Sequence, residues 1–163
     1  MTPSPNDSPL HLDFAGLARA FLLAGAILLA GPALAAESVR YVALVDGGKN
    51  AGHQVVTRGD DGVTRVDFIF KDNGRGPELK EEFALAPDGT FARYQVKGSS
   101  TFGAVVDESF SRSGDRVQWR STSDKGEQDL GGGVGMYTPL SGSPEAFSVA
   151  IGALSRRPDG KLR

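Results

Sequence analysis

The side chains best suited to acid–base chemistry are acidic residues that gather in two short segments. They are Glu78, Glu81, Glu82, Asp107 and Glu108. Two carboxyl groups can act as acid and base in glycoside hydrolysis when burial separates their pKa values. In a strand, however, Glu81 and Glu82 point to opposite faces, and Lys80 and Arg75 are close enough in sequence to neutralise them. The pattern therefore favours solvated ion pairs over a catalytic pair.

Histidine and cysteine, which often serve as base, nucleophile or metal ligand, are scarce. The chain has no cysteine, and His53 is the only histidine after residue 35. A zinc site needs three or four converging ligands, and no H-x-H or H-E-x-x-H motif occurs. A G-x-S-x-G motif is missing too, and no Gly-Lys-Ser/Thr follows the glycines at 131–135. We predict no catalytic, metal-binding or cofactor-binding residue, and we expect His53 at the surface or on an edge strand.

Length and charge exclude several classes of protein. The chain has 163 residues, with 18 basic and 20 acidic side chains and a formal net charge of −2. This is the length of one domain. Because charges of both signs are scattered throughout, the chain lacks the basic face with which proteins neutralise nucleic-acid phosphates. The absence of cysteine excludes a disulfide framework, and 22 glycines indicate many turns between short elements.

The first 35 residues have the pattern of a secretory signal peptide. Residues 21–30, FLLAGAILLA, form an apolar run that is too short to span a bilayer comfortably. Arg19 precedes the run and an Ala-Leu-Ala site follows it, so we expect cleavage between Ala35 and Ala36. The alternative is an uncleaved anchor, since residues 20–36 carry no charge, but a Gly-Pro pair interrupts that stretch. We expect a periplasmic or secreted protein with no transmembrane span after cleavage.

The next part of the chain consists of short runs with the alternation of β-strands, separated by turn residues. The runs lie at residues 38–46, 52–58, 63–71, 78–85, 90–98, 105–112 and 116–123. In the third run, Val66, Phe68 and Phe70 share one face, whereas the opposite face is charged. Turns recur about every 8 to 12 residues, a spacing typical of an antiparallel meander.

A helix is expected near the end of the chain, after a short strand at residues 136–140. Ser143 is suited to cap this helix, and Pro144 is suited to its first position. The apolar residues that follow at helical spacing are Phe147, Ala150, Ile151 and Leu154. We expect Phe147, Ile151 and Leu154 to fix the helix to one face of the sheet.

Together these elements predict a mainly β fold. We expect an antiparallel meander, shaped as an open half-barrel or curved sheet, with one C-terminal amphipathic helix packed on it. Residues 36–163 are expected to form a single domain. Residues 161–163 follow a turn and begin a further element, which favours a chain truncated at its C-terminus, with a frayed tail as the alternative.

Aromatic side chains are the remaining resource for binding. They are Phe68, Phe70, Phe83, Tyr94, Phe110 and Trp119. If they line a half-barrel that the helix does not fill, they can hold an acyl chain or another small apolar ligand. In the alternative, which we favour, they form the core of a small sheet under the helix.

A further set of short motifs runs through the β-rich region in order. They are VDF (66–68), NGRGP (73–77), LKEE (79–82), YQVKG (94–98), STFGA (100–104), DE (107–108), WRS (119–121) and SPE (143–145). In this order they resemble the N-terminal region of a group of exported bacterial amidohydrolases, over nearly all of residues 38–163. In that family, the β-rich region precedes a metal-dependent hydrolase barrel, whose metal is held by histidines, an aspartate and often a carboxylated lysine.

The resemblance implies a non-catalytic accessory domain, or a fragment, of a periplasmic amidohydrolase-like protein, because that ligand set is absent from this sequence. A divalent metal is then expected only in the missing barrel, and the partner of this chain is its own C-terminal hydrolase domain. We expect Asn73, Arg75 and Glu81 to contact that domain, since the Gly-Arg-Gly-Pro loop is rigid. The alternative is a stand-alone periplasmic binding protein that holds a lipid or other apolar ligand on its half-barrel sheet.

Overall fold

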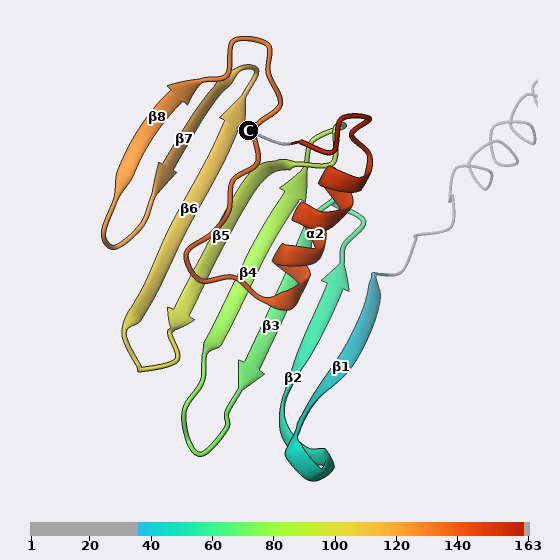
Figure 1. Cartoon of the computed structure of the whole chain (residues 1–163), viewed down its shortest axis with the longest axis vertical. Coiled ribbons are helices and arrows are strands. Elements are labelled where there is room, and N and C mark those ends of the chain that lie inside the picture. Colours follow the sequence, from blue (N-terminus) through green and yellow to red (C-terminus); the bar gives the residue numbers. More distant parts are fainter. Residues whose placement is uncertain (1–35, 162–163) are drawn as a thin grey trace, which may run out of the picture. The chain divides into compact units, whose positions relative to one another are not determined.

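The computed structural model describes residues 36–161, which form a single antiparallel sheet with one helix on it (Figure 1). The predicted signal peptide and Ala35 lie outside the described residues. The strands are β1 (Glu37–Val45), β2 (Lys49–Arg58), β3 (Thr64–Phe70), β4 (Glu78–Leu85), β5 (Phe91–Ser99), β6 (Val105–Ser113), β7 (Arg116–Arg120) and β8 (Lys125–Asp129). A 3-10 turn, η1 (Asp46–Gly48), joins β1 to β2, and helix α2 (Pro144–Ser155) follows the last strand.

Strand order in the sheet equals strand order in the chain. Each strand pairs antiparallel with the next one, from β1 to β8, and the sheet is open at β1 and β8. This confirms the predicted meander with a C-terminal helix. Strong two-residue alternation predicts these strands well, because one face of the sheet is covered and the other faces solvent.

The covered face, called the inner face below, carries the core. Val66, Phe68 and Phe70 all lie on it, as their spacing predicts. Its centre is aromatic: the Phe83 and Phe91 rings meet edge to face at 5.2 Å, and Phe91 lies 5.0 Å from Tyr94. All three side chains are at most 2% exposed. Favourable ring geometry therefore adds to the burial of a large apolar area.

The opposite, outer face is polar. Arg65 lies 3.7 Å from Glu82 and Lys80 lies 3.4 Å from Asp67, each pair bridging β3 and β4. These side chains are largely exposed, so the ion pairs contribute little to stability. Their role is to keep this face solvated.

Helix α2 begins as predicted but turns a different side to the sheet. The Ser143 hydroxyl accepts a hydrogen bond from the Ala146 amide at 3.3 Å, and Pro144 occupies the first turn. Ala146 and Ala153 are the buried side chains of the helix. The predicted stripe is instead exposed, with Phe147 at 46%, Ile151 at 68% and Leu154 at 41%. The prediction that these three residues fix the helix to the sheet was therefore wrong.

The small buried side chains explain this orientation. Alanine lets a helix backbone lie close to a sheet, and Ala146 belongs to the same core cluster as Phe83 and Tyr94. The first turn is also held by polar contacts to the sheet, since the Arg58 guanidinium lies 2.8 Å from the Glu145 carboxylate. These contacts fix the rotation of the helix, and hydrophobic periodicity alone does not contain that information.

Two other differences concern the end of the chain. Strand β8, with the sequence KGEQD, was not predicted, because it has no apolar alternation and owes its structure to pairing with β7. Residues 136–140, predicted as a short strand, have no regular structure. Whether each of these segments is a strand depends on backbone pairing with a neighbouring strand, and amino-acid composition does not indicate such pairing.

Candidate functional site

Two acidic residues of the inner face are buried. By register, Glu81 of β4 and Glu108 of β6 flank Val96 of β5 in one cross-strand row. Glu81 is 1% exposed and Glu108 is 3% exposed. A buried carboxylate needs hydrogen-bond donors to offset its lost hydration, and both find them in the segment between β8 and α2.

Glu81 holds the start of the helix. Its Oε2 accepts a hydrogen bond from the Ser143 hydroxyl at 2.6 Å, and its Oε1 accepts from the Ser143 amide. The Tyr94 hydroxyl also donates to Oε1, at 3.0 Å. One carboxylate thus satisfies the residue that caps α2 and the hydroxyl of a core tyrosine.

Glu108 holds the segment that precedes the helix. Its Oε2 accepts from the Leu140 amide at 2.9 Å and from the Tyr137 hydroxyl at 3.1 Å, and its Oε1 accepts from the Ser141 amide at 2.9 Å. Each carboxylate oxygen therefore has a donor. The two glutamates together fasten residues 137–143 across the inner face.

The expectation of solvated ion pairs was wrong for Glu81 and Glu108. It holds for Glu82, which lies near Arg65, and for Glu78, which lies 3.2 Å from Lys71. It was wrong for Asp107 as well, because one of its carboxylate oxygens is buried and the residue forms no ion pair among residues 36–161. A signal was present in the sequence, because Glu81 alternates with Leu79 and Phe83 on an apolar face. An acid at such a position indicates a buried, hydrogen-bonded carboxylate.

Burial raises the pKa of Glu81 and of two tyrosines that donate to the glutamates. Desolvation raises the pKa of Glu81 above its ordinary value, although hydrogen bonds from Ser143 and Tyr94 act in the opposite direction. Desolvation and the facing carboxylates also raise the pKa of Tyr94 and Tyr137. Both carboxylates are inaccessible to a substrate and fully hydrogen-bonded, so they act as fasteners of the fold and not as a catalytic pair.

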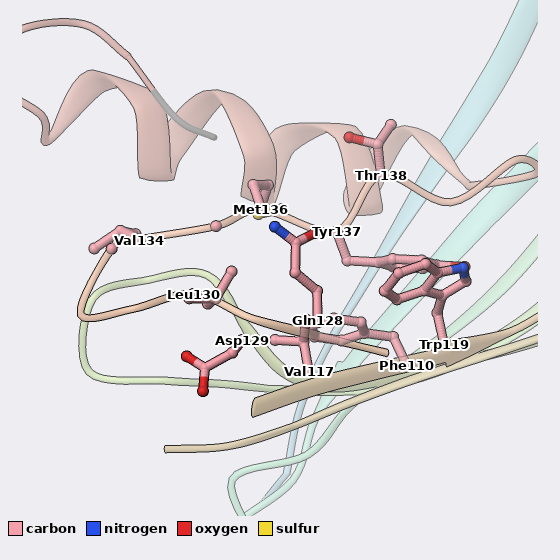
Figure 2. Close-up of a pocket in the computed structure, with 12 residues that line it drawn as sticks. Phe110, Val117, Trp119, Gln128, Asp129, Leu130, Val134, Met136, Tyr137 and Thr138 are labelled. Carbon is pink, nitrogen blue, oxygen red and sulfur yellow. The ribbon is translucent and has the colours of Figure 1, made fainter. Parts of the chain in front are cut away.

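Beside the fastened segment lies a cavity of about 450 Å³, here called the β6–β8 pocket. The sheet supplies Phe110, Val117 and Trp119 as its floor, and residues 130–138, here called the covering segment, form its opposite wall (Figure 2). Leu130, Met136 and Tyr137 are the large side chains of that wall.

The pocket has an aromatic end and an aliphatic end. The rings of Phe110 and Tyr137 stack at 4.7 Å, and Figure 2 shows Trp119 beside them. Leu130 and Val134 lie toward the other end. Gln128 is a polar side chain that also lines the cavity. Such a lining, mostly apolar with few polar groups, is typical of small-molecule sites.

Glycine and hydrogen bonds shape the floor near Trp119. Gly126 of β8 lies opposite Trp119, and a Cβ there would come 2.4 Å from the indole ring. The indole N–H donates to the Asp124 carboxylate at 2.9 Å. The indole is therefore fixed from two sides, with its ring at the pocket.

The covering segment is tied to the sheet at both of its ends. The Gly132 amide donates to Asp115 at 2.9 Å, and the Gly131 amide donates to Asp129 at 2.8 Å. At the other end, Glu108 holds Tyr137 and Leu140. Between these anchors, residues 133–136 form the wall of the pocket opposite the sheet.

Five of the six aromatic residues named from the sequence belong to the core or pack against it, and Phe70 is half-buried. Phe83 and Tyr94 belong to the core under α2, in agreement with the interpretation as a packed sheet. Only Phe110 and Trp119 line the β6–β8 pocket. The inner face is thus closed beneath the helix and open at one side, an arrangement that alternation cannot reveal.

The remaining predicted residues are not brought together. His53 lies on β2 opposite Ile69, on the outer face. Asn73 and Arg75 are exposed in the loop between β3 and β4, whereas Glu81 is buried against Ser143. Within residues 36–161, no group of three or more histidine and acidic side chains is arranged to hold a metal ion.

Two further findings concern membrane-spanning helices and the comparison with known proteins. Over the described residues, no helix has the length and apolar character needed to cross a membrane. A scan against protein-family models and searches of curated proteins and of solved structures found no match to this chain.

Proposed function

We propose that residues 36–161 form a non-catalytic binding domain that takes a small apolar ligand, or the apolar part of a lipid, into the β6–β8 pocket. The observation that carries the proposal is the pocket itself, with three aromatic side chains and a volume of about 450 Å³. This volume lies within the range of known ligand sites. With the apolar run at residues 21–30 acting as a signal peptide, the domain would work in the periplasm or outside the cell.

The proposal places the ligand at the side of the sheet and not across its whole inner face. Beneath α2, side chains such as Phe83, Phe91 and Val96 fill the space. At β6–β8, the covering segment spans the floor without filling it. A ligand that enters there would bury apolar surface against Trp119, Phe110 and Met136, at about 25 cal/mol per Å².

Trp119 offers a direct test, because it is the only tryptophan of the chain. We would titrate the purified protein with dodecanoate, and separately with 1-anilinonaphthalene-8-sulfonate, and follow indole fluorescence. Saturable change with either probe is expected, and native mass spectrometry should find co-purified apolar ligand. Indole emission that does not respond to either probe, together with a ligand-free mass spectrum, would reject the proposal.

A matched pair of variants locates the site. Val134→Phe places a ring into the pocket wall and should weaken probe binding about tenfold or more, which corresponds to about 1.4 kcal/mol. Val105→Phe makes the same change at an exposed position outside the pocket and should leave binding unchanged. Equal effects of the two substitutions on probe binding would show that the ligand binds outside the β6–β8 pocket.

A second candidate function is that of an accessory domain of an amidohydrolase-like protein. It is favoured by the order of motifs described above and by the exposed stripe Phe147, Ile151 and Leu154 of α2. Exposed apolar surface of this kind often packs against another domain. In this case the stripe would face the hydrolase barrel, and any divalent metal would be bound there.

The nucleotide sequence downstream of codon 163 tests this second candidate function. A reading frame that continues past codon 163 into a region with an H-x-H motif would support the accessory role. A stop codon followed by an unrelated gene would exclude it and leave the binding domain. This outcome is independent of the fluorescence titration, so the two candidates can fail separately.

A further inference from the structure

The two edges of the sheet differ in how they are protected. Within residues 36–161, β1 and β8 each have one side that pairs with no other strand. The sequence of β8, KGEQD, is short and polar, which discourages pairing with another strand. Strand β1 is nine residues long, and Tyr41, Val42 and Leu44 are each at least half exposed on it. A long edge with exposed apolar side chains is suited to receive a further strand.

We propose that the strand received by β1 is β1 of a second copy of this chain, in an antiparallel pair centred on Ala43. We choose a second copy as the partner of β1 because the charges of the two strands are complementary in this register. In this register, Arg40 of each copy lies opposite Asp46 of the other, so two ion pairs form at the ends of the paired segment. A two-fold axis through Ala43 makes the interface self-complementary, as closed dimers require.

The apolar side chains agree with the same register. On the outer face, Val42 of one copy lies opposite Leu44 of the other, twice, between the two ion pairs. On the inner face, Tyr41 lies opposite Val45 of the second copy, beside a groove of about 360 Å³ that Tyr41 lines together with Phe68 and Pro144. A shift by one residue would place Arg40 opposite Val45 and would exchange the two faces.

Neither charged residue is used within the copy itself. Arg40 and Asp46 are exposed, and no ion pair involving either is formed among residues 36–161. Asp46 directly follows Val45, whose backbone is extended, and it begins the turn η1 at the end of the strand. Both side chains are therefore available to a second copy, and substituting them should not affect the fold.

A charge exchange tests the register. Sedimentation velocity of the purified protein over a range of concentrations should show a monomer–dimer equilibrium. Arg40→Asp should place like charges at both ends of the pair and raise the dimer dissociation constant about tenfold, and Asp46→Arg should do the same. An equimolar mixture of the two variants should dimerise again, because each acidic side chain then faces a basic one of the other variant.

Controls separate this interface from other causes. Arg120→Asp makes the same charge change on β7, away from β1, and should leave the dissociation constant unchanged. Circular dichroism of all variants should match that of the unchanged protein. A monomer at every soluble concentration would overturn the proposal. A dimer that survives either charge reversal, or a mixture that stays monomeric, would overturn it as well.

Discussion

The half of the sheet under α2 and the half at β6–β8 have similar sequence patterns but differ in packing: the first is filled, and the second leaves a cavity. In both, apolar side chains alternate along the strands toward the inner face. Under the helix, Ala146 and Ala153 allow close approach and the core is filled. At β6–β8, a glycine-rich segment covers the floor at a distance and leaves a cavity of about 450 Å³. The difference lies in what covers the strands and not in the strands themselves.

The contrast between the filled half and the open half also explains the structural role of Glu81 and Glu108. Glu81 and Glu108 lie between the closed half and the open half, and both accept hydrogen bonds from the segment that crosses from one to the other. They hold the helix tightly at one side and the wall of the pocket at the other. A firmly fixed wall is a condition for a pocket that keeps its shape.

The largest effect that separates the two halves should come from truncating one aromatic residue in each. Phe83→Ala removes a ring that contacts Phe91 at 5.2 Å, in a filled core, and should lower the free energy of unfolding by about 3–5 kcal/mol. Phe110→Ala removes a ring that already borders the pocket and should cost roughly 2 kcal/mol, since fewer contacts are lost. Urea unfolding measures both. Equal losses would contradict the distinction between a filled and an open half.

The next effect concerns the fastening glutamates. Glu81→Ala leaves the amide and hydroxyl of Ser143 and the Tyr94 hydroxyl without their acceptor, and should cost about 2–4 kcal/mol. Glu82→Ala is the matched control on the adjacent, exposed position and should stay within about 0.5 kcal/mol of the unchanged protein. If the two substitutions cost the same, Glu81 is not a fastener.

The sequence was sufficient to predict most strands of the sheet but insufficient to predict how the helix and the covering segment lie on it. Seven strands follow from alternation and turn residues, because each has a covered face and a solvated one. Strand β8 depends on backbone pairing with its neighbour β7, and the rotation of α2 depends on contacts with residues far along the chain, such as Glu81. The pocket was not predictable for the same reason: it is the space between Trp119 and a segment with no regular structure. The buried role of Glu81 was predictable in principle, from its place between Leu79 and Phe83.

A smaller effect tests which side of the helix meets the sheet. Ala153→Leu forces a larger side chain into a buried position and should destabilise the protein by about 1–3 kcal/mol. Ile151→Ala, which removes a residue of the exposed stripe, should cost no more than about 0.5 kcal/mol. Thermal unfolding of both variants would check this. The reverse order of the two losses would restore the orientation that the hydrophobic periodicity predicts.

The subtlest effect is on the pH dependence of stability. Because burial raises the pKa of Glu81 in the folded state, the folded protein holds this proton more tightly than the unfolded chain does. The corresponding stability is fully present below the ordinary value of 4.5 and is lost as the pH rises through the raised pKa.

Glu81→Gln removes this titration but keeps an oxygen acceptor for Ser143. The difference in unfolding free energy, unchanged protein minus variant, should therefore fall as the pH rises above 4.5. Asp61, Asp88 and Glu127, whose pKa values are lowered by their arginine, hydroxyl and amide partners, act with the opposite sign but cancel in this difference. A difference that rises with pH would mean that the donors around Glu81 outweigh its burial, and the glutamate would then be held in the folded protein as a stabilised anion.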